Sequence, residues 1–191
     1  MIRIRLTEND EIKMTDEEFN DFFDEYDLDD DDLILPFEEV KDCIKGITLL
    51  STKEAENLLT EEQRICKYNN EECWWLRSPG YYKGRAAYVY FDGSVNYFGH
   101  RVSPANYCVR PALILSTLKS SNLKSIEELG AGERFEFGGY TFTIISNKLA
   151  LCDEAIAKMA FREDWEAKDA NDYEKSDIKK FLDNWFRENY K

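Results

Sequence analysis

The chain has 191 residues, of which 43% are hydrophobic and 14% aromatic, and its formal net charge is −14. This composition supports a folded core and excludes a wholly disordered chain, and no apolar run approaches the roughly 20 residues of a membrane span. Five cysteines, an odd number without an export signal at the start of the sequence, predict reduced thiols in a cytoplasmic protein.

The acidic charge is concentrated near the N-terminus. Between Glu8 and Asp32 there are fourteen acidic residues and one basic residue, so this segment carries −13 of the total. Such a field repels nucleic acids and membranes and attracts basic partners, which predicts a protein partner with a basic surface. The candidate contact residues are Asp24, Glu25, Asp27, Asp29, Asp30, Asp31 and Asp32. The alternative is a solvated face that keeps the protein soluble.

In chain order, the first predicted element is a half-buried strand, because apolar residues alternate with arginines over residues 2–6. Thr15 and Glu18 have the spacing of a capping box, and aromatic residues follow them at helical spacing. A second, short helix is expected to carry Ile44 on its inner face and to end at Gly46.

The middle of the chain predicts a strand over residues 47–50, and then a helix over residues 52–59 that Ser51 caps. A β-hairpin is expected around Asp92-Gly93, in a type I′ turn that places Tyr88 opposite Tyr97.

A further strand is expected over residues 109–115, with Pro111 at an edge or bulge. Residues 116–133 are rich in Ser, Lys and Gly and are predicted to be a connection containing a short helix. Gly138-Gly139 predicts a second hairpin turn. The chain then has one more strand and ends on an amphipathic helix that Ser176 caps.

The acidic loop also contains a candidate calcium site. Asp27, Asp29, Asp31 and Glu38 stand at positions 1, 3, 5 and 12 of an EF-hand loop, and Leu33 offers its carbonyl at position 7. Against this interpretation, position 6 is an aspartate and not a glycine, and no second loop exists for pairing. In so acidic a stretch, chance matches are common.

One pair of motifs carries a resemblance to a known family. The sequence WWLRSPG at residues 74–80 is followed by VRPAL at residues 109–113. This combination resembles a bacterial domain family of uncharacterised function. That family is similar to the C-type-lectin-like fold of sulfatase-modifying factors and of the variable receptor-binding proteins of diversity-generating retroelements. The resemblance implies an α+β fold with twisted antiparallel sheets and flanking helices.

The segment order differs from that family. Segments similar to residues 137–145 and 173–182 normally open the domain, but here they follow the signature. A circular permutation explains this order, with residues 116–133 joining the old ends, since termini often lie close together. The alternative is a domain-swapped dimer. We therefore expect an acidic N-terminal segment over residues 1–46 and a permuted domain over residues 47–191.

The chemistry of the chain favours binding over catalysis. His100 is the single histidine, and no serine or cysteine stands in a nucleophile motif. The cysteines do not match the reactive pair of sulfatase-modifying factors, and we interpret them as small apolar residues. Within the signature, Trp74 and Trp75 are expected in the core. Arg77 and Arg110 are expected to bond loop carbonyls or buried acids.

The stretch from Tyr81 to Tyr107 predicts a recognition surface. It holds six of the eleven tyrosines, and Tyr, Ser and Asn on loops of a rigid scaffold are typical of adaptable binding surfaces. The resemblance implies that ligand contacts lie here. The candidate contact residues are Tyr81, Tyr82, Asn96, His100, Asn106 and Tyr107. The alternative is that the tyrosines pack the sheets.

Together these features predict a non-enzymatic protein-binding module, monomeric or dimeric, without a cofactor. One concrete version is a phage or mobile-element inhibitor whose acidic surface engages a basic, nucleic-acid-binding host protein. The alternatives are a calcium-dependent ligand or sugar binder and an oxidase of the sulfatase-modifying type.

Overall fold

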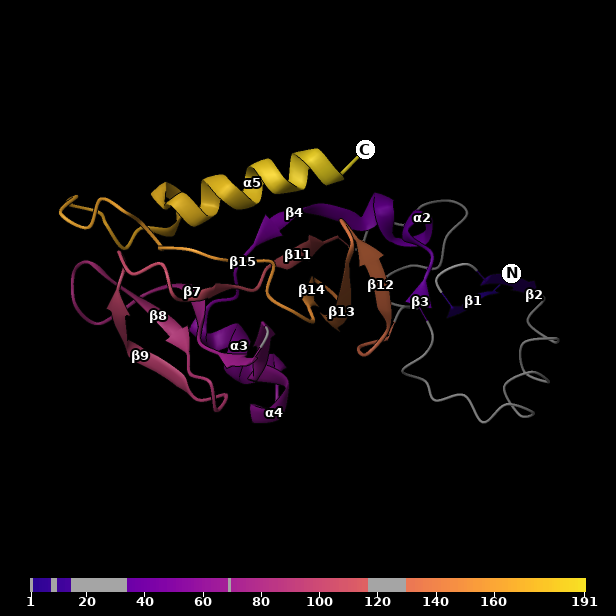
Figure 1. Ribbon diagram of the computed structural model, residues 1–191, viewed down its shortest axis with the longest axis horizontal. Helices are drawn as coiled ribbons and strands as arrows, with labels where there is room; N and C mark the ends of the chain where they lie inside the picture. Colours follow the sequence, from indigo (N-terminus) through magenta and orange to yellow (C-terminus); the bar gives the residue numbers. More distant parts are fainter. Residues whose placement is uncertain (1, 8–9, 15–33, 69, 117–129) are drawn as a thin grey trace.

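Two large β-sheets form the frame of the protein, and helices pack against them (Figure 1). The computed structural model describes residues 2–7, 10–14, 34–68, 70–116 and 130–191. The fold is α+β, as the sequence predicts. No helix in these ranges is long and apolar enough to cross a membrane.

The six-stranded sheet has the order β3-β12-β13-β14-β11-β4. Its strands are β3 (Ile34–Leu35), β4 (Ile44–Thr48), β11 (Ala112–Leu115), β12 (Arg134–Phe137), β13 (Tyr140–Ser146) and β14 (Leu149–Cys152).

The five-stranded sheet has the order β15-β10-β7-β8-β9. Its strands are β7 (Trp74–Pro79), β8 (Arg85–Val89), β9 (Val95–Arg101), β10 (Cys108–Val109) and β15 (Ala157–Lys158). Two further hairpins pair β1 (Ile2–Thr7) with β2 (Asp10–Met14) and β5 (Cys66–Tyr68) with β6 (Asn70–Glu72).

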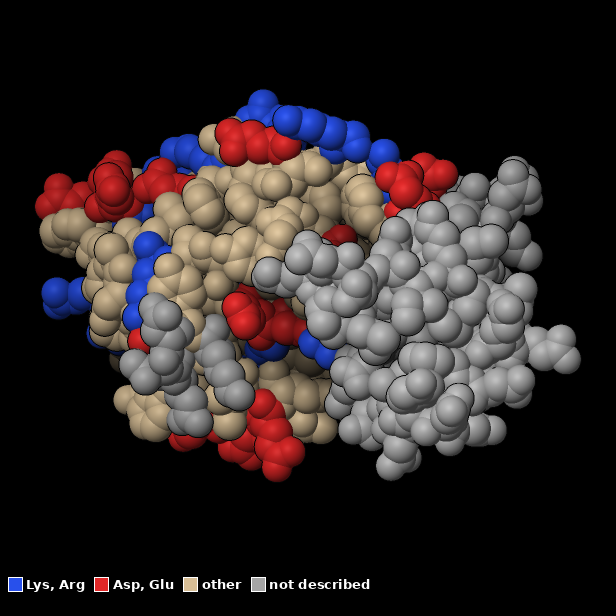
Figure 2. Space-filling model, turned by 45° about the vertical axis from the view of Figure 1, so that its right-hand side comes forward, with Lys and Arg blue, Asp and Glu red and all other residues tan. Residues whose placement is uncertain are grey.

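The helices are short except the last one. They are α2 (Phe37–Val40), the 3-10 turn η2 (Lys41–Cys43), α3 (Thr52–Leu58), α4 (Glu61–Arg64), the 3-10 turn η3 (Tyr173–Lys175) and α5 (Asp177–Asn189). The helix α5 lies along β4 (Figure 1). Basic and acidic side chains alternate along the top of the molecule in Figure 2, where α5 lies. Lys179 pairs there with Asp183 at 2.6 Å.

Local sequence rules correctly predicted where α3 and α5 begin. Ser51 and Glu54 form the expected capping box of α3, and the Ser176 hydroxyl accepts a hydrogen bond from the Lys179 amide to cap α5. The prediction of a helix that ends at Gly46 is wrong for its last residues. Residues 44–46 belong to β4, because they pair with β11 in the six-stranded sheet. The predicted domain boundary after residue 46 therefore falls inside a strand.

The two hairpins differ in how well their turns were predicted. Gly138 and Gly139 both have positive φ angles and join β12 to β13 in the expected two-residue turn. In the other hairpin the predicted register is wrong by one residue, since Tyr88 pairs with Asn96. The Gly93 amide donates to the Tyr90 carbonyl at 3.0 Å, which makes a three-residue loop with Gly93 at a φ of 87°.

The chain crosses from one sheet to the other at Arg110 and Pro111. The predicted single strand over residues 109–115 is in fact two strands, β10 in the five-stranded sheet and β11 in the six-stranded sheet. Pro111 has no amide hydrogen, so the ladder cannot continue through it. Its carbonyl instead accepts from the Cys152 amide at 2.9 Å.

The core is continuous between the sheets and the C-terminal helix. Trp75 and Val109 from the five-stranded sheet belong to the same buried cluster as Phe142, Ile144 and Leu182. Residues 134–191 therefore form no separate body. A circular permutation requires this arrangement, because segments moved to the C-terminus of the sequence must still pack in the core of the same domain.

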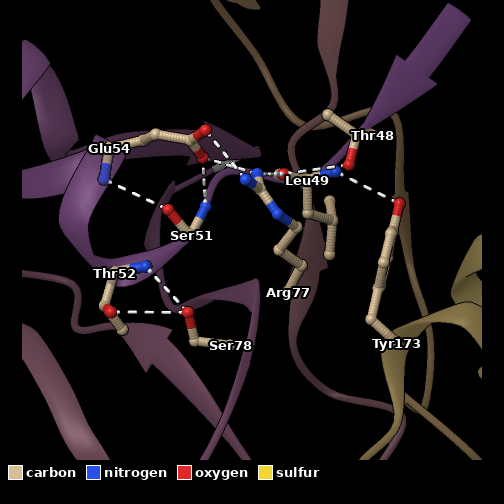
Figure 3. Close-up of polar contacts among 8 residues, drawn as sticks. All are labelled: Thr48, Leu49, Ser51, Thr52, Glu54, Arg77, Ser78 and Tyr173. Carbon is tan, nitrogen blue, oxygen red and sulfur yellow. Dashed lines mark hydrogen bonds and ion pairs between the residues drawn. The ribbon is translucent and has the colours of Figure 1, made fainter.

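A polar network connects the centre of the chain to its C-terminal part (Figure 3). The Arg77 guanidinium donates to the Leu49 carbonyl at 2.7 Å and to the Glu54 carboxylate at 2.8 Å. The Leu49 amide donates to the Tyr173 hydroxyl at 3.2 Å. Burial alone would raise the pKa of Glu54, but hydrogen bonds from Arg77 and Ser51 outweigh it and hold the pKa below its ordinary value. Glu54 therefore stays ionised and keeps Arg77 in place.

Candidate binding surface

Three glycines shape the turn between β7 and β8. A Cβ atom on Gly80 would lie 2.8 Å from the Phe98 carbonyl oxygen, and one on Gly99 would lie 2.6 Å from the Ala86 carbonyl oxygen. Gly99 and Gly84 also have positive φ angles, of 75° and 73°, a conformation that costs other residues free energy. The backbones of the turn and of β9 thus touch directly, and backbone contacts hold the turn in place.

The turn presents aromatic side chains to solvent. Tyr81 is 75% exposed, Tyr82 56% and Phe98 65%. The ring centroid of Tyr81 lies 4.9 Å from that of Tyr82 and 6.0 Å from that of Phe98, so the three rings form one cluster. We call these three residues the aromatic patch. Contiguous exposed apolar surface of this kind is typical of interaction sites.

A groove begins beside the aromatic patch. It has a volume of about 980 Å³ and is lined by Tyr82, Lys83, Gly84, Arg85, Arg101, Ser103, Trp165 and Glu166. Trp165 is 58% exposed and comes from the segment between β15 and η3. The Arg85 guanidinium lies over the Tyr82 ring at 5.4 Å and donates to the Gly99 carbonyl at 3.1 Å. The groove therefore combines aromatic faces with a concentration of positive charge.

The tip of the β8–β9 hairpin is anchored to α4. The Arg64 side chain donates to the Gly93 carbonyl at 2.6 Å. A Cβ atom on Gly93 would lie 2.2 Å from the Glu61 carbonyl oxygen, so glycine is the residue that fits. Tyr90 and Phe91 beside this tip are exposed.

Other tyrosines of the predicted recognition stretch lie in the core. Tyr107 is 7% exposed and stacks on Trp75 with ring centroids 4.3 Å apart. Tyr88 packs edge-on against both rings, at 5.0 and 6.5 Å. Burial raises the pKa of Tyr88 and Tyr107 above the ordinary value. The predicted contact residue Tyr107 therefore occupies a position that supports packing rather than contact with a partner.

The remaining predicted contact residues have mixed positions. Asn106 is exposed. The Asn96 side-chain oxygen accepts from the Gly99 amide at 3.0 Å, which stabilises the irregular part of β9. His100 is half-buried beside Tyr107 at 5.1 Å, and its Nδ1 atom is buried without a hydrogen-bond partner among the described residues.

The signature residues have the structural roles expected of them. Trp74 and Trp75 are fully buried. The Trp74 indole donates to the Arg64 carbonyl at 2.8 Å. Arg77 bonds a carbonyl and the Glu54 carboxylate (Figure 3). The Arg110 guanidinium, 6% exposed, donates to the Cys152 and Gln63 carbonyls and lies over the Trp74 ring.

The five cysteines are free thiols, and four of them are buried. Burial raises the pKa of Cys66 to about 11 and that of Cys108 and Cys152 to about 12. Burial also raises the pKa of Cys43 and Cys73. Because the thiolate is the nucleophile and the metal ligand, these thiols are poorly suited to either role at neutral pH.

The predicted acidic contacts and most of the predicted calcium loop lie outside the described residues. These are Asp24, Glu25, Asp27, Asp29, Asp30, Asp31, Asp32 and Leu33, together with the predicted helix after Thr15 and the short helix in the 116–133 connection. Glu38 is described; it is exposed and lies 3.8 Å from the Lys41 ammonium. Within the described ranges no group of three His, Cys, Asp or Glu side chains is arranged to hold a metal ion.

Sequence reasoning missed several residues of the surface, among them Lys83, Phe98, Arg101 and Trp165. Trp165 had a usable signal. It stands alone in a charged stretch, Arg162 to Asp172, where no strand or helix pattern explains a large apolar side chain. The other three lie in or beside the hairpin, where the wrong register hid their direction.

Residues 34–117 match the model of a family described as a domain of unknown function, DUF6273. The match contains both signature motifs and runs from β3 to β11, so this part of the chain resembles an uncharacterised domain family. The strands β12 to β14 and α5 lie beyond it. No curated protein and no solved structure matched the chain.

Proposed function

We propose that this protein is a non-enzymatic binding module that holds a partner protein against its aromatic patch. The observation that carries the proposal is the cluster of three exposed aromatic rings on a turn that backbone contacts keep in place. Aromatic side chains on a rigid base bury large areas at low conformational cost. They are also the residue types enriched at energetically important contacts.

The state of the thiols supports binding over the oxidase alternative. An oxidase of the sulfatase-modifying type needs a reactive cysteine. The described cysteines have raised pKa values because they are buried. Copper binding together with thiol reactivity at neutral pH would favour the oxidase.

The acidic segment supports a partner that also carries basic surface. The charge of −13 between Glu8 and Asp32 would raise the rate of encounter with such a partner. An inhibitor from a phage or mobile element, directed at a nucleic-acid-binding protein, is the version of this proposal that the charge favours.

The continuous core supports a C-type-lectin-like fold in permuted order. In this proposal, β12, β13 and α5 are the displaced opening segments of the domain. The strands β12 and β13 share one sheet with β4 and β11, and α5 packs on the same core. A structure of a family member with the usual order would test it: equivalent strands would occupy the same places with the connections changed.

The binding proposal is tested by comparing two variants in affinity capture. The patch variant is Y81S/Y82S/F98S, and the control is I114S, which removes an exposed apolar side chain from the other sheet. Both are tagged, expressed in the source cell and analysed by mass spectrometry.

We expect a protein captured by the wild type and by I114S to be lost with the patch variant, and the purified pair to reproduce this difference. Equal capture by all three proteins would contradict the proposal. Circular dichroism of each variant shows that the fold is retained.

A further inference from the structure

The groove beside the aromatic patch contains unpaired cations. Lys83 and Arg101 are exposed, and neither side chain makes an ion pair or a hydrogen bond with the described residues. Several cations elsewhere form ion pairs, for example Lys158 with Glu72 at 2.6 Å and Arg134 with Asp153 at 2.9 Å. Glu166 is the one acidic side chain among the described groove residues. Positive charge there is thus available to a ligand.

Aromatic faces stand beside these cations. Tyr82 and Trp165, both more than half exposed, line the same groove. A Cβ atom on Gly84 would lie 3.6 Å from the Trp165 carbonyl oxygen, so the two walls approach each other at this glycine. The Arg85 guanidinium lies over the Tyr82 ring, 5.4 Å from its centroid, and lines the same groove.

We propose that the groove binds an acidic peptide segment of the partner protein, in which a carboxylate lies next to an apolar side chain. The carboxylate pairs with Arg101 and Lys83, and the apolar side chain lies between Tyr82 and Trp165. Guanidinium and carboxylate form paired, charge-assisted hydrogen bonds, which makes Arg101 the stronger of the two contacts. This inference rests on the proposed protein-binding function.

Charge and shape favour a peptide over a nucleic acid. A net charge of −14 repels a polyanion at long range, whereas a short segment with a few carboxylates meets mainly the local field of the groove. The Tyr82 ring belongs both to the groove and to the aromatic patch. An extended peptide can therefore cover both surfaces without a break.

The test is an NMR titration of the full-length, isotope-labelled protein. The probes are a capped decapeptide with the central sequence Asp-Glu-Phe-Asp, its Asn-Gln-Phe-Asn counterpart, inorganic phosphate and a (dT)10 oligonucleotide. We expect the acidic peptide to shift the amides of Lys83, Gly84 and Arg101 and the Trp165 indole in a saturable manner. The affinity of the neutral peptide should be at least about tenfold lower than that of the acidic peptide, because the neutral peptide lacks charge-assisted contacts.

Two double variants locate the binding. K83Q/R101Q should weaken the acidic peptide about tenfold or more. The control K53Q/K148Q removes the same charge from two exposed lysines on α3 and on the β13–β14 turn, away from the groove. It should leave the affinity unchanged.

Three results would overturn the inference: no shift of groove residues at millimolar peptide, equal affinity for the neutral peptide, or tighter saturable binding of (dT)10 or phosphate. The first two leave no acidic-peptide site, and the third assigns the groove to phosphate ligands. The proposed function is tested separately with the variant Y81S/F98S, which keeps the groove residue Tyr82 and changes only residues outside the groove lining. If Y81S/F98S abolishes partner capture while the groove gives no peptide shift, the function stands and this inference falls.

Discussion

Around the six-stranded sheet, aromatic side chains point inward. Phe135 and Phe142 are fully buried, and Phe137 contacts the Trp185 ring of α5 at 5.4 Å. Around the five-stranded sheet the same residue types also face solvent. Of the eight exposed large hydrophobic side chains in the described residues, seven lie on or beside it: Tyr81, Tyr82, Tyr90, Phe91, Tyr97, Phe98 and Trp165. The aromatic side chains of the six-stranded sheet therefore stabilise the core, whereas the five-stranded sheet also presents aromatic side chains that can contact a partner.

The sharpest test of this division exchanges one phenylalanine on each side for alanine. F142A should lower the free energy of unfolding by about 3–5 kcal/mol, because it leaves a cavity in the core. F98A should change it by less than about 0.5 kcal/mol, because the side chain is exposed. Urea denaturation monitored by circular dichroism measures both. Similar losses would mean that Phe98 is part of the core and that the division is false.

The second test concerns the backbone under the aromatic patch. G99A should cost about 2–4 kcal/mol, because its φ of 75° strains an L-residue and its Cβ atom meets the Ala86 carbonyl. The matched control is G139A in the other sheet, where φ is 81° but no atom lies within 4 Å. Only the conformational strain remains there, about 1 kcal/mol. Equal costs in urea denaturation would show that the close backbone contact contributes nothing.

The third test uses pH to examine the network of Figure 3, which joins α3 to β7. Because Glu54 has a lowered pKa, its contribution to stability is present at neutral pH. It is lost as the pH falls through the ordinary glutamate range, about 4.3, and on through the lower folded pKa. E54Q should therefore cost about 2 kcal/mol at pH 7 and progressively less toward pH 3.

Urea unfolding of wild type and E54Q over this pH range measures the difference. The control D164N, at an exposed position, should give no such convergence. A constant difference between wild type and E54Q at all pH values would contradict the ionic role of Glu54.

The smallest expected effect concerns the acidic segment and contact with a partner. Changing residues 29–32, all aspartate, to asparagine removes four of the fourteen acids there. Association with a captured basic partner should slow by up to about tenfold at low salt, and its salt dependence should flatten. Surface plasmon resonance at several salt concentrations measures this. Unchanged rates would identify the segment as a solvated face.

Elements governed by local chemistry were predictable from the sequence. The Ser51 and Ser176 caps, the Gly138-Gly139 turn and the apolar stripe of α5 depend on neighbours a few residues away. The register of the β8–β9 hairpin was not predictable in this way. A Cβ atom on Gly93 would collide with the Glu61 carbonyl oxygen, so the hairpin tip packs against a residue 32 positions earlier. The break at Pro111 likewise depends on partner strands in two different sheets.

The candidate surface was predictable only as a region. The tyrosine-rich stretch was identified, but its members separate into exposed and buried ones for tertiary reasons. Tyr107 is buried and stacks on Trp75, whereas Tyr81 lies in the turn between β7 and β8 and is 75% exposed. Trp165 lies at least 62 residues further along the chain than the opposite wall of the groove, a separation over which periodicity carries no information.

The crossing at Arg110 and Pro111 has a consequence for how the chain acquires its structure. Each large sheet combines strands that are remote in sequence; Ile34, for example, pairs with Arg134, one hundred residues later. Such a high contact order predicts refolding on a timescale of about milliseconds to seconds. On the ribosome, β4 emerges well before its neighbour β11, and β11 emerges before β14. The edge of β4, and then that of β11, therefore stays unpaired and open to aggregation until the last third of the chain has been synthesised.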